Sequence, residues 1–220
     1  MKRVLAALAL FSLAAGSVAL AESKPPTKAP AKASGKETSA EEERRFFTEE
    51  AAAPMIKPAN YDVTIVEYMD YQCPYCRASH GPLKQLLAKD KKVRVIFRDW
   101  PIFRPASEAA ALAAIASKYQ GKYVAMHDAL METPLPLNQD KIKAAARKAG
   151  VDWARLQKDM GAHADEIEDL FQRNDKQAQL LGLEGTPGFI IGNVQSFGGM
   201  DLPKFEKAVA RARREAAKKS

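Results

Sequence analysis

The sequence predicts an α/β domain in which a β-α-β unit is followed by a helical insertion, a β-hairpin and a last helix. Two strand patterns flank a helix within residues 61–100, about 75 residues with helical periodicity follow, and strand patterns return at 188–197. The chain has 220 residues, of which 46% are hydrophobic and 28% charged. This size and composition predict one globular domain with appendages.

The chain begins with a pattern typical of a secretory signal peptide. Residues 1–21, MKRVLAALALFSLAAGSVALA, run from a basic start through an apolar stretch to a small-x-small ending, which predicts cleavage after Ala21. A transmembrane anchor is the alternative, but Ser12, Gly16 and Ser17 interrupt an apolar run shorter than the roughly 20 residues of a span. We therefore expect a periplasmic or otherwise exported protein that is soluble after cleavage.

The charge balance does not predict a nucleic-acid partner. Loss of Lys2 and Arg3 with the signal peptide lowers the formal net charge from +7 to +5 (7 minus 2). Much of the remaining positive charge lies in residues 24–36 and 211–219, without interleaved aromatic side chains. Solvated tails explain it better.

Two segments precede the main domain. Residues 22–38 are rich in Pro, Lys, Ala and Ser and predict a disordered linker. Residues 39–58 predict an N-terminal helix and a connector, because Ser39 and Glu42 match a capping box, and we expect the helix to reach about Ala53.

The predicted N-terminal helix has little apolar surface of its own. Apart from small alanines it offers Phe46 and Phe47, too little for a core. These residues either dock on the main domain or form a contact between protomers. The second alternative would make the protein a homo-oligomer through this helix.

The main domain is predicted to span residues 59–217. YDVTIVEYM at 61–69 and KVRVIFRDW at 92–100 are rich in β-branched and aromatic residues, which favours two strands. Glu67 alternates with Val63 and Ile65, so it lies on an apolar face of the first strand. We expect its side chain to be buried.

The helical insertion is predicted at about 104–182. Glycines at 150 and 182 mark the ends of two helices. After them, Gly192 and Asn193 predict the turn of a hairpin, and Asp201 predicts the cap of the last helix. Apolar stripes support the inserted helices: Leu112, Ile115, Ala116 and Tyr119; Ile142, Ala145, Ala146 and Ala149; Trp153, Leu156 and Met160; Ile167, Leu170, Phe171, Ala178 and Leu181.

The segment EYMDYQCPYCRASHGP at 67–82 holds the only two cysteines of the chain, Cys73 and Cys76. A structural zinc site needs four ligands, and the chain adds only three histidines, which are His80, His127 and His163. A structural disulfide would close a loop too short to constrain the unfolded chain much. Redox exchange is the favoured interpretation, since a Cys-x-x-Cys pair within a β-α-β unit is typical of it.

The two cysteines should have different roles. Cys73 at the start of a helix faces unpaired N–H groups and the positive end of the helix dipole, which favours its thiolate. Pro74 suits the first helical turn, where no N–H is needed. Cys76, one turn further on, should remain a thiol until it resolves the mixed disulfide.

From about Tyr61 to Ala210 the chain resembles the DsbA-like family of exported bacterial thiol:disulfide oxidoreductases. CPYC at 73–76, GTPGF at 185–189 and an acid six residues before the first cysteine carry the resemblance. It implies a thioredoxin-like fold with an α-helical insertion. It also implies cysteine-containing protein substrates and a membrane redox partner that resets the pair, with no cofactor and no metal.

The resemblance assigns roles to further residues. Pro187 matches a cis-proline that faces the disulfide, and Thr186 before it matches a residue whose backbone binds an extended peptide. Glu67 matches a buried acid thought to help move the proton of the second thiol. Pro74 and Tyr75 lie where the redox potential is tuned. His80, His127 and Trp100 are expected to be structural or peripheral.

Two positions depart from the strongest oxidants of the family, which carry histidine in place of Tyr75 and valine in place of Thr186. Tyr75 adds no cation beside Cys73, so we expect a less oxidising pair. Similar residues occur in isomerases and ScsC-like proteins, some of which join through N-terminal segments. General exchange with protein substrates is the leading interpretation. An oligomeric isomerase or reductase, or a peptide-binding or metal-sequestering thioredoxin-like module, is the alternative.

Overall fold

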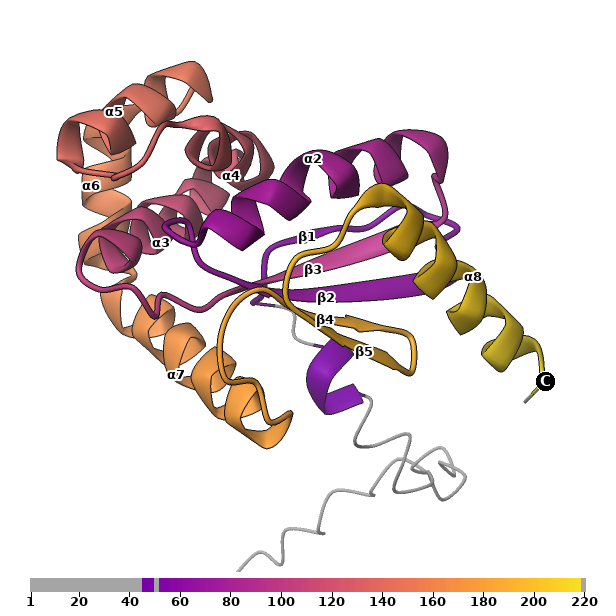
Figure 1. The fold of residues 1–220 in the computed structure, drawn as a ribbon. Coiled ribbons are helices and arrows are strands. Elements are labelled where there is room, and N and C mark those ends of the chain that lie inside the picture. Colours follow the sequence, from indigo (N-terminus) through magenta and orange to yellow (C-terminus); the bar gives the residue numbers. More distant parts are fainter. Residues whose placement is uncertain (1–44, 50–51, 219–220) are drawn as a thin grey trace, which may run out of the picture. The chain divides into compact units, whose positions relative to one another are not determined.

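The computed structural model describes residues 45–49 and 52–218, which contain a mixed five-stranded sheet flanked by helices (Figure 1). The strand order is β1-β3-β2-β4-β5, with β2 and β3 parallel and the other neighbours antiparallel. The strands are β1 (Met55–Ile56), β2 (Val63–Met69), β3 (Val93–Asp99), β4 (Gly188–Ile191) and β5 (Val194–Phe197). The predicted β-α-β unit and hairpin are confirmed.

The helices follow the predicted order, with one between β2 and β3, a long insertion before β4 and one after β5. None of the helices in the part of the chain that the structure describes is both long and apolar enough to cross a bilayer. They are α2 (Pro74–Lys89), α3 (Ala106–Ala116), the 3-10 helix η1 (Ser117–Gln120), α4 (Tyr123–Glu132), α5 (Gln139–Lys148), α6 (Trp153–Ala162), α7 (Ala164–Leu180) and α8 (Leu202–Ala217).

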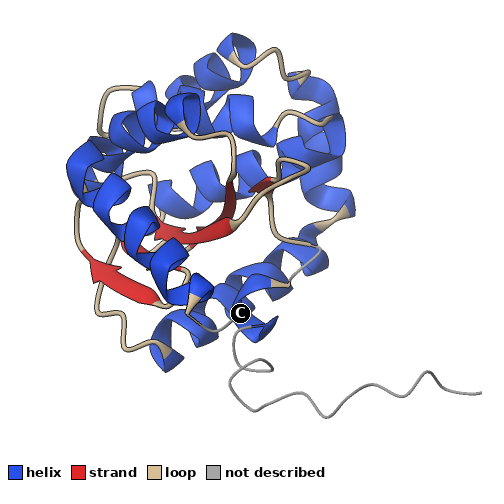
Figure 2. Ribbon diagram, turned by 90° about the vertical axis from the view of Figure 1, so that its right-hand side faces the viewer, coloured by secondary structure: helices blue, strands red, loops and turns tan. Residues whose placement is uncertain are grey.

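Helices cover both faces of the sheet, and Figure 2 shows helices around the central strands. Side chains alternate along β2, so Val63, Ile65 and Met69 join the core cluster that contains Cys73 and Cys76. Residues of α2, of α8 and of the inserted helices α3 to α7 belong to the same cluster. Val66 and Tyr68 face the other way and pack in a second cluster with Ala178 of α7. This is an α/β fold with a helical insertion, as predicted.

Caps and turns lie where the sequence predicts them. The carboxylates of Asp152 and Asp201 accept hydrogen bonds from the N–H groups of Arg155 and Lys204 in the first turns of α6 and α8. Gly150 and Gly182 follow α5 and α7 with φ of 69° and 67°, a conformation that favours glycine. Local sequence therefore fixes the ends of these helices.

The segment before β2 differs from its prediction. The described helical residues are 45–48, so the prediction of a helix as far as Ala53 is wrong. The predicted connector contains β1, whose Met55 and Ile56 pair with Ile96 and Val95 of β3. Pairing satisfies the open edge of β3, which outweighs the weak strand signal of two residues. The signal peptide, the linker and the capping pair Ser39 and Glu42 lie outside the described residues.

The short N-terminal segment is held against its own domain by its main chain. The carbonyl of Phe46 accepts a hydrogen bond from Gln177 Nε2, and that of Phe47 accepts one from Arg98 Nη2, each at 2.9 Å. The side chain of Phe46 remains 48% exposed. The docking alternative therefore has direct contacts in this structure.

Candidate active site

The cysteine pair lies at the start of α2, directly after the loop that leaves β2. Cys73 is the N-cap of the helix, and Pro74 occupies its first position. The N–H of Cys76 points at Cys73 Sγ at a distance of 3.4 Å, and both sulfurs belong to reduced cysteines. Both side chains are nearly covered, Cys73 at 1% and Cys76 at 0% exposure. The sequence prediction of a cysteine at the helix start is confirmed.

The two thiols have opposite electrostatic environments. The pKa of Cys73 is lowered to about 6, mainly by a hydrogen bond from the neighbouring Cys76 thiol. Burial opposes this shift, and the N–H groups of Tyr75 and Cys76 lower the pKa further towards that value. Burial raises the pKa of Cys76 far above its ordinary value, and the neighbouring Cys73 raises it further. At neutral pH Cys73 is thus the thiolate and Cys76 the thiol.

Thr186 and Pro187 stand opposite the pair, in the segment between α7 and β4. The bond between them is a cis peptide bond, as the resemblance implies. In its thiol form Cys73 Sγ donates to the carbonyl of Thr186 at 3.2 Å, so a residue 113 positions away contacts the sulfur. The Pro187 carbonyl accepts a hydrogen bond from the N–H of Gly198 at 2.9 Å, which ties the segment to the end of β5.

Packing explains why a glycine follows Pro187. A Cβ on Gly188 would approach the Leu183 side chain to 2.7 Å, closer than van der Waals contact allows. The glycine therefore lets Leu183 pack under the Thr186 and Pro187 segment.

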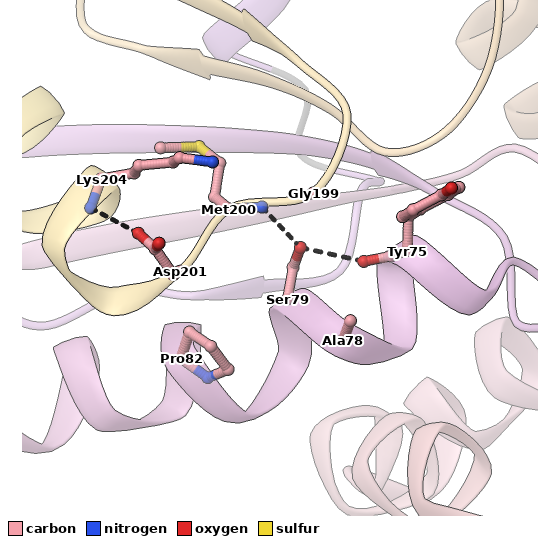
Figure 3. Close-up of a pocket in the computed structure, with 8 residues that line it drawn as sticks. All are labelled: Tyr75, Ala78, Ser79, Pro82, Gly199, Met200, Asp201 and Lys204. Carbon is pink, nitrogen blue, oxygen red and sulfur yellow. Dashed lines mark hydrogen bonds between the residues drawn. The ribbon is translucent and has the colours of Figure 1, made fainter.

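Two open grooves border the site. One is lined by Tyr75, Ser79 and Pro82 of α2 and by residues 199–201 and Lys204 (Figure 3). Ser79 Oγ donates to the Tyr75 carbonyl and accepts from the N–H of Met200, both at 2.9 Å. The other groove is lined by Thr186, Pro187 and Phe197 together with Gly182, Glu184, Gly185 and Gly198. Tyr75 is 67% exposed and Phe197 61% exposed, so each groove has an aromatic side chain at its rim.

Glu67 is buried on the sheet face that α2 covers. It pairs with Phe97 and Phe189 on the neighbouring strands, and the side chain is only 2% exposed. Its Oε2 has no hydrogen-bond partner among the residues that the structure describes. Burial, together with a smaller contribution from the nearby Asp99, raises the pKa of Glu67 to about 8. The predicted burial is confirmed.

Asp99, which was not among the predicted site residues, joins Glu67 on this face. Asp99 is opposite Met69 in the β2–β3 register, two residues along from the partner of Glu67. Tyr123 donates to Asp99 Oδ2 at 2.8 Å, and burial raises the pKa of Asp99 to about 7. An acid at the end of a buried strand could have drawn attention to Asp99, but its partner Tyr123 lies in the insertion and is not visible from the local sequence.

Asp70 was also missed, and it organises the cysteine loop. Its carboxylate accepts hydrogen bonds from the N–H of Gln72 at 2.7 Å, from Ser107 Oγ at 2.6 Å and from the N–H of Phe103 at 3.0 Å. Its own N–H points at Cys76 Sγ at 3.5 Å. A carboxylate at the end of a buried strand must find such donors, which is the signal that could have identified it.

Arg77 fixes the first turn of α2 to the insertion. Its guanidinium donates to the carbonyls of Tyr71, Leu130 and Thr133. Leu130 lies in the last turn of α4 and Thr133 is its C-cap, so Arg77 joins α2 to α4 at this point.

The three histidines do not gather around the cysteines. His127 is packed among the rings of Tyr71, Phe97 and Tyr123, and His80 lies beside it with ring centroids 5.1 Å apart. His163 stacks on Tyr119 elsewhere in the insertion. Trp100 donates to Asp175 Oδ1 at 2.9 Å and is 9% exposed.

Comparison with known proteins places this geometry in a family. Residues 64–210 match the model of the DSBA-like thioredoxin domain. A thioredoxin-like oxidoreductase from Silicibacter pomeroyi is 37% identical with a TM-score of 0.74, and the match covers 78% of this chain and 98% of that structure. The thiol-disulfide exchange protein α-DsbA2 from Wolbachia pipientis is 28% identical with a TM-score of 0.73, over 78% and 92% of the two chains.

Other matches are more distant or partial. The catalytic domain of Proteus mirabilis ScsC has a TM-score of 0.70 at 24% identity over 78% of this chain and 95% of that structure, which shows a shared fold. The Na+/H+ antiporter NhaA 1 of Salinispora arenicola is 27% identical over 157 residues, which are 70% of this chain and 24% of the antiporter. The chain thus spans about a quarter of the length of the curated relatives it matches. By the family model and these structures, the chain belongs to the DSBA-like thioredoxin domain family, and its fold is that of a DsbA-like thiol-disulfide oxidoreductase.

Proposed function

We propose that this protein is an exported enzyme that exchanges disulfides with protein substrates through Cys73 and Cys76. The observation that carries the proposal is the opposite environment of the two thiols. A pKa of about 6 makes Cys73 a thiolate at neutral pH, while burial keeps the proton on Cys76. Such a pair has one sulfur ready to attack and one held in reserve.

The exchange proceeds in two balanced steps. The Cys73 thiolate attacks one sulfur of a substrate disulfide, forms a mixed disulfide and releases the other sulfur as a thiolate. Cys76 then loses its proton and attacks Cys73 Sγ, which releases the second substrate sulfur as a thiolate. The substrate disulfide is thereby reduced to two thiols while Cys73 and Cys76 form a disulfide. The reverse sequence oxidises a substrate.

Glu67 is proposed to exchange the proton of Cys76. It shares the sheet face under α2 with the core cluster that contains Cys76. A carboxyl group with a pKa of about 8 gains and loses a proton close to neutral pH, as an acid–base group requires. Glu67→Gln should therefore slow the resolution of mixed disulfides without preventing their formation.

Thr186, Pro187 and the two grooves are proposed to hold the substrate chain. The Thr186 carbonyl touches Cys73 Sγ, so a peptide bound along this segment would present its sulfur to the attacking atom. Tyr75 and Phe197 offer exposed aromatic surface on either side. Pro74 and Tyr75 are proposed to tune the redox potential from the first turn of the helix. A membrane protein that resets the pair completes the proposed cycle.

The decisive experiment supplies two substrates to catalytic amounts of the protein with residues 1–21 removed. A reduced multi-disulfide protein should regain its disulfides in the presence of the oxidised enzyme and of oxidised glutathione, which accepts the electrons and reoxidises the enzyme. A scrambled, fully oxidised substrate should regain activity with the reduced enzyme only if isomerisation is a function. Failure of the enzyme with both substrates would contradict the proposal.

Assembly through the N-terminal segment is the second candidate, because isomerisation commonly uses several sites that face one client. Sedimentation of the protein with residues 1–21 removed, against a version that starts at Ala52, separates the alternatives. This boundary keeps β1, which pairs with β3. Identical monomers would remove the basis for an oligomeric isomerase.

A holding function is tested by the same cysteine variant that tests catalysis. Cys73→Ser should lose exchange entirely. If it still protects unfolded clients from aggregation, the Thr186 and Pro187 surface binds peptides independently of chemistry.

A further inference from the structure

A histidine of α2 meets a histidine and an aspartate of α4 that are far from it in the sequence. His80 comes from α2, and His127 and Asp128 come from α4. One possible ligand atom from each lies within 4.8 Å of the other two. His80 Nε2 and Asp128 Oδ1 are 3.3 Å apart, close to the separation of about 3.3 Å between two ligands of a tetrahedral zinc ion with bonds of about 2.0–2.1 Å.

The His80 side chain has an unused nitrogen that points into this cluster. The residue is 7% exposed, and its Nε2 is buried with no hydrogen-bond partner among residues 45–49 and 52–218. The approach to Asp128 therefore lacks the alignment of a hydrogen bond. A buried nitrogen without a hydrogen-bond partner is unfavourable unless another group uses its lone pair or its proton.

His127 is buried, and one of its ring nitrogens already has a polar partner. It is 3% exposed, and its Nδ1 lies 3.2 Å from the Tyr71 hydroxyl. A metal bound through the other ring nitrogen would leave that hydrogen bond in place, which is the usual arrangement behind a ligating histidine.

We propose that His80, His127 and Asp128 form a binding site for a divalent transition-metal ion such as Zn2+, separate from the cysteine pair. Two imidazoles and one carboxylate are ligands suited to zinc, and three protein ligands leave a position for water. The ion would join the helix that carries the cysteines to the insertion, close to the point where Arg77 already joins them. The proposal does not depend on the exchange activity.

Lys84 sets the strength of this site. Its Nζ is 2.9 Å from Asp128 Oδ2 and 3.3 Å from Glu132 Oε1, whereas His80 faces the other oxygen, Oδ1. The Lys84 ammonium therefore leaves Asp128 Oδ1 available to a metal ion, but its positive charge repels an incoming cation. Removal of this charge by Lys84→Gln should tighten metal binding.

The test is calorimetric titration of Zn2+ into the disulfide form of the protein, in which the cysteines cannot bind metal. We expect one ion per chain and a rise in the melting temperature with zinc concentration. His80→Gln and Asp128→Asn should each weaken binding at least about tenfold. Lys84→Gln should strengthen it several-fold.

His163→Gln is the matched control. His163 also faces a carboxylate, with Nδ1 3.5 Å from Glu166 Oε2, but it belongs to no group of three possible ligands in the described part of the chain. This variant should bind Zn2+ as the wild type does. Circular dichroism checks that each variant is folded, and Asp128→Asn is the safest of them because its side chain is 31% exposed.

Three results would overturn the proposal. The first is a disulfide form that takes up no zinc. The second is binding that survives both His80→Gln and Asp128→Asn. The third is equal loss of binding in His163→Gln, since that would indicate general weak binding to surface histidines and carboxylates.

Discussion

Ionisable groups are buried both in the first turn of α2 and on the sheet beneath it, where Glu67 and Asp99 lie. Their pKa values shift in opposite directions. At the helix start the pKa of Cys73 falls to about 6 although its side chain is 1% exposed. On the sheet below, the pKa of Glu67 rises to about 8 and that of Asp99 to about 7 at similar exposure. Cys73 Sγ accepts hydrogen bonds from the Cys76 thiol and from N–H groups at the helix start, whereas Glu67 Oε2 has no hydrogen-bond partner among the described residues.

Hydrogen bonds outweigh burial at Cys73, whereas at Asp99 the hydrogen bond from Tyr123 does not. Burial alone favours the neutral form of an acid, and donors aimed at the charged atom can reverse the effect. The two regions thus have different proton affinities. Under the proposed function, Cys73 would be the nucleophile and Glu67 would hold the proton that moves near neutral pH.

Replacement of the nucleophile should have the largest effect. Cys73→Ser removes the low-pKa sulfur, and a serine hydroxyl is not ionised at neutral pH, so exchange with a disulfide substrate should fall to the uncatalysed rate. Cys76→Ser is the control, because it keeps Cys73 and should accumulate mixed disulfides, visible on a non-reducing gel. Equal residual turnover in both variants would contradict the assignment of the attacking sulfur.

Glu67→Gln should change how stability depends on pH. The pKa of Glu67 is raised from 4.5 to about 8, so its unfavourable contribution is absent below pH 4.5 and grows as the pH rises towards 8. The variant should be the more stable protein at pH 8 by up to about 4 kcal/mol, since one unit corresponds to about 1.4 kcal/mol. Urea unfolding at pH 5 and pH 8 measures it. Parallel curves for both proteins would show that Glu67 does not titrate in this window.

Cys73 should contribute the opposite slope in the reduced protein. Its pKa is lowered from 9.0 to about 6, so its stabilising contribution is complete above pH 9 and is lost as the pH falls through 6. Unfolding of reduced wild type against Cys73→Ser over pH 5 to 9 should show the gap widening with pH. The ultraviolet absorbance of the thiolate gives the pKa of Cys73 directly. A value near 9 would show that its pKa is not lowered and would contradict the contrast with Glu67.

Asp70→Ala should destabilise the fold and the cysteine loop together. It removes the acceptor of three hydrogen bonds, from Gln72, Phe103 and Ser107, and leaves their donors without this partner. We expect a loss of about 3 kcal/mol in the free energy of unfolding. Asp152→Ala, which removes only a helix cap, should cost about 1 kcal/mol. Equal losses would mean that Asp70 is no more than a cap.

Tyr75→His should have the smallest effect. Wild-type protein is expected to have a reduction potential between about −270 mV and −120 mV, the values of thioredoxin and DsbA. A histidine beside Cys73 adds partial positive charge, which favours the thiolate and should raise the potential by about 30 mV. Equilibration with glutathione measures both values. Tyr75→Phe should leave the potential unchanged, because it adds no charge.

Much of the fold followed from short-range signals. The strands β2 and β3, the hairpin turn at Gly192 and Asn193 and the cap at Asp201 depend on a few neighbouring residues, which the sequence displays directly. The burial of Glu67 followed from alternation with Val63 and Ile65. The strand β1 was missed because two residues carry too little signal, and its pairing with β3 supplies the missing stability.

The position of the cysteine pair at a helix start could be predicted from the sequence, because the cysteines, Pro74 and the start of α2 are contiguous and a helix start has the same donors in any fold. Which distant groups meet depends on the tertiary structure. Thr186 touches Cys73 across 113 positions, Asp99 finds Tyr123, and His80 finds His127 and Asp128. These contacts depend on how α2, the insertion and the sheet pack together, and packing joins residues whose separation along the chain contains no record of their distance in space.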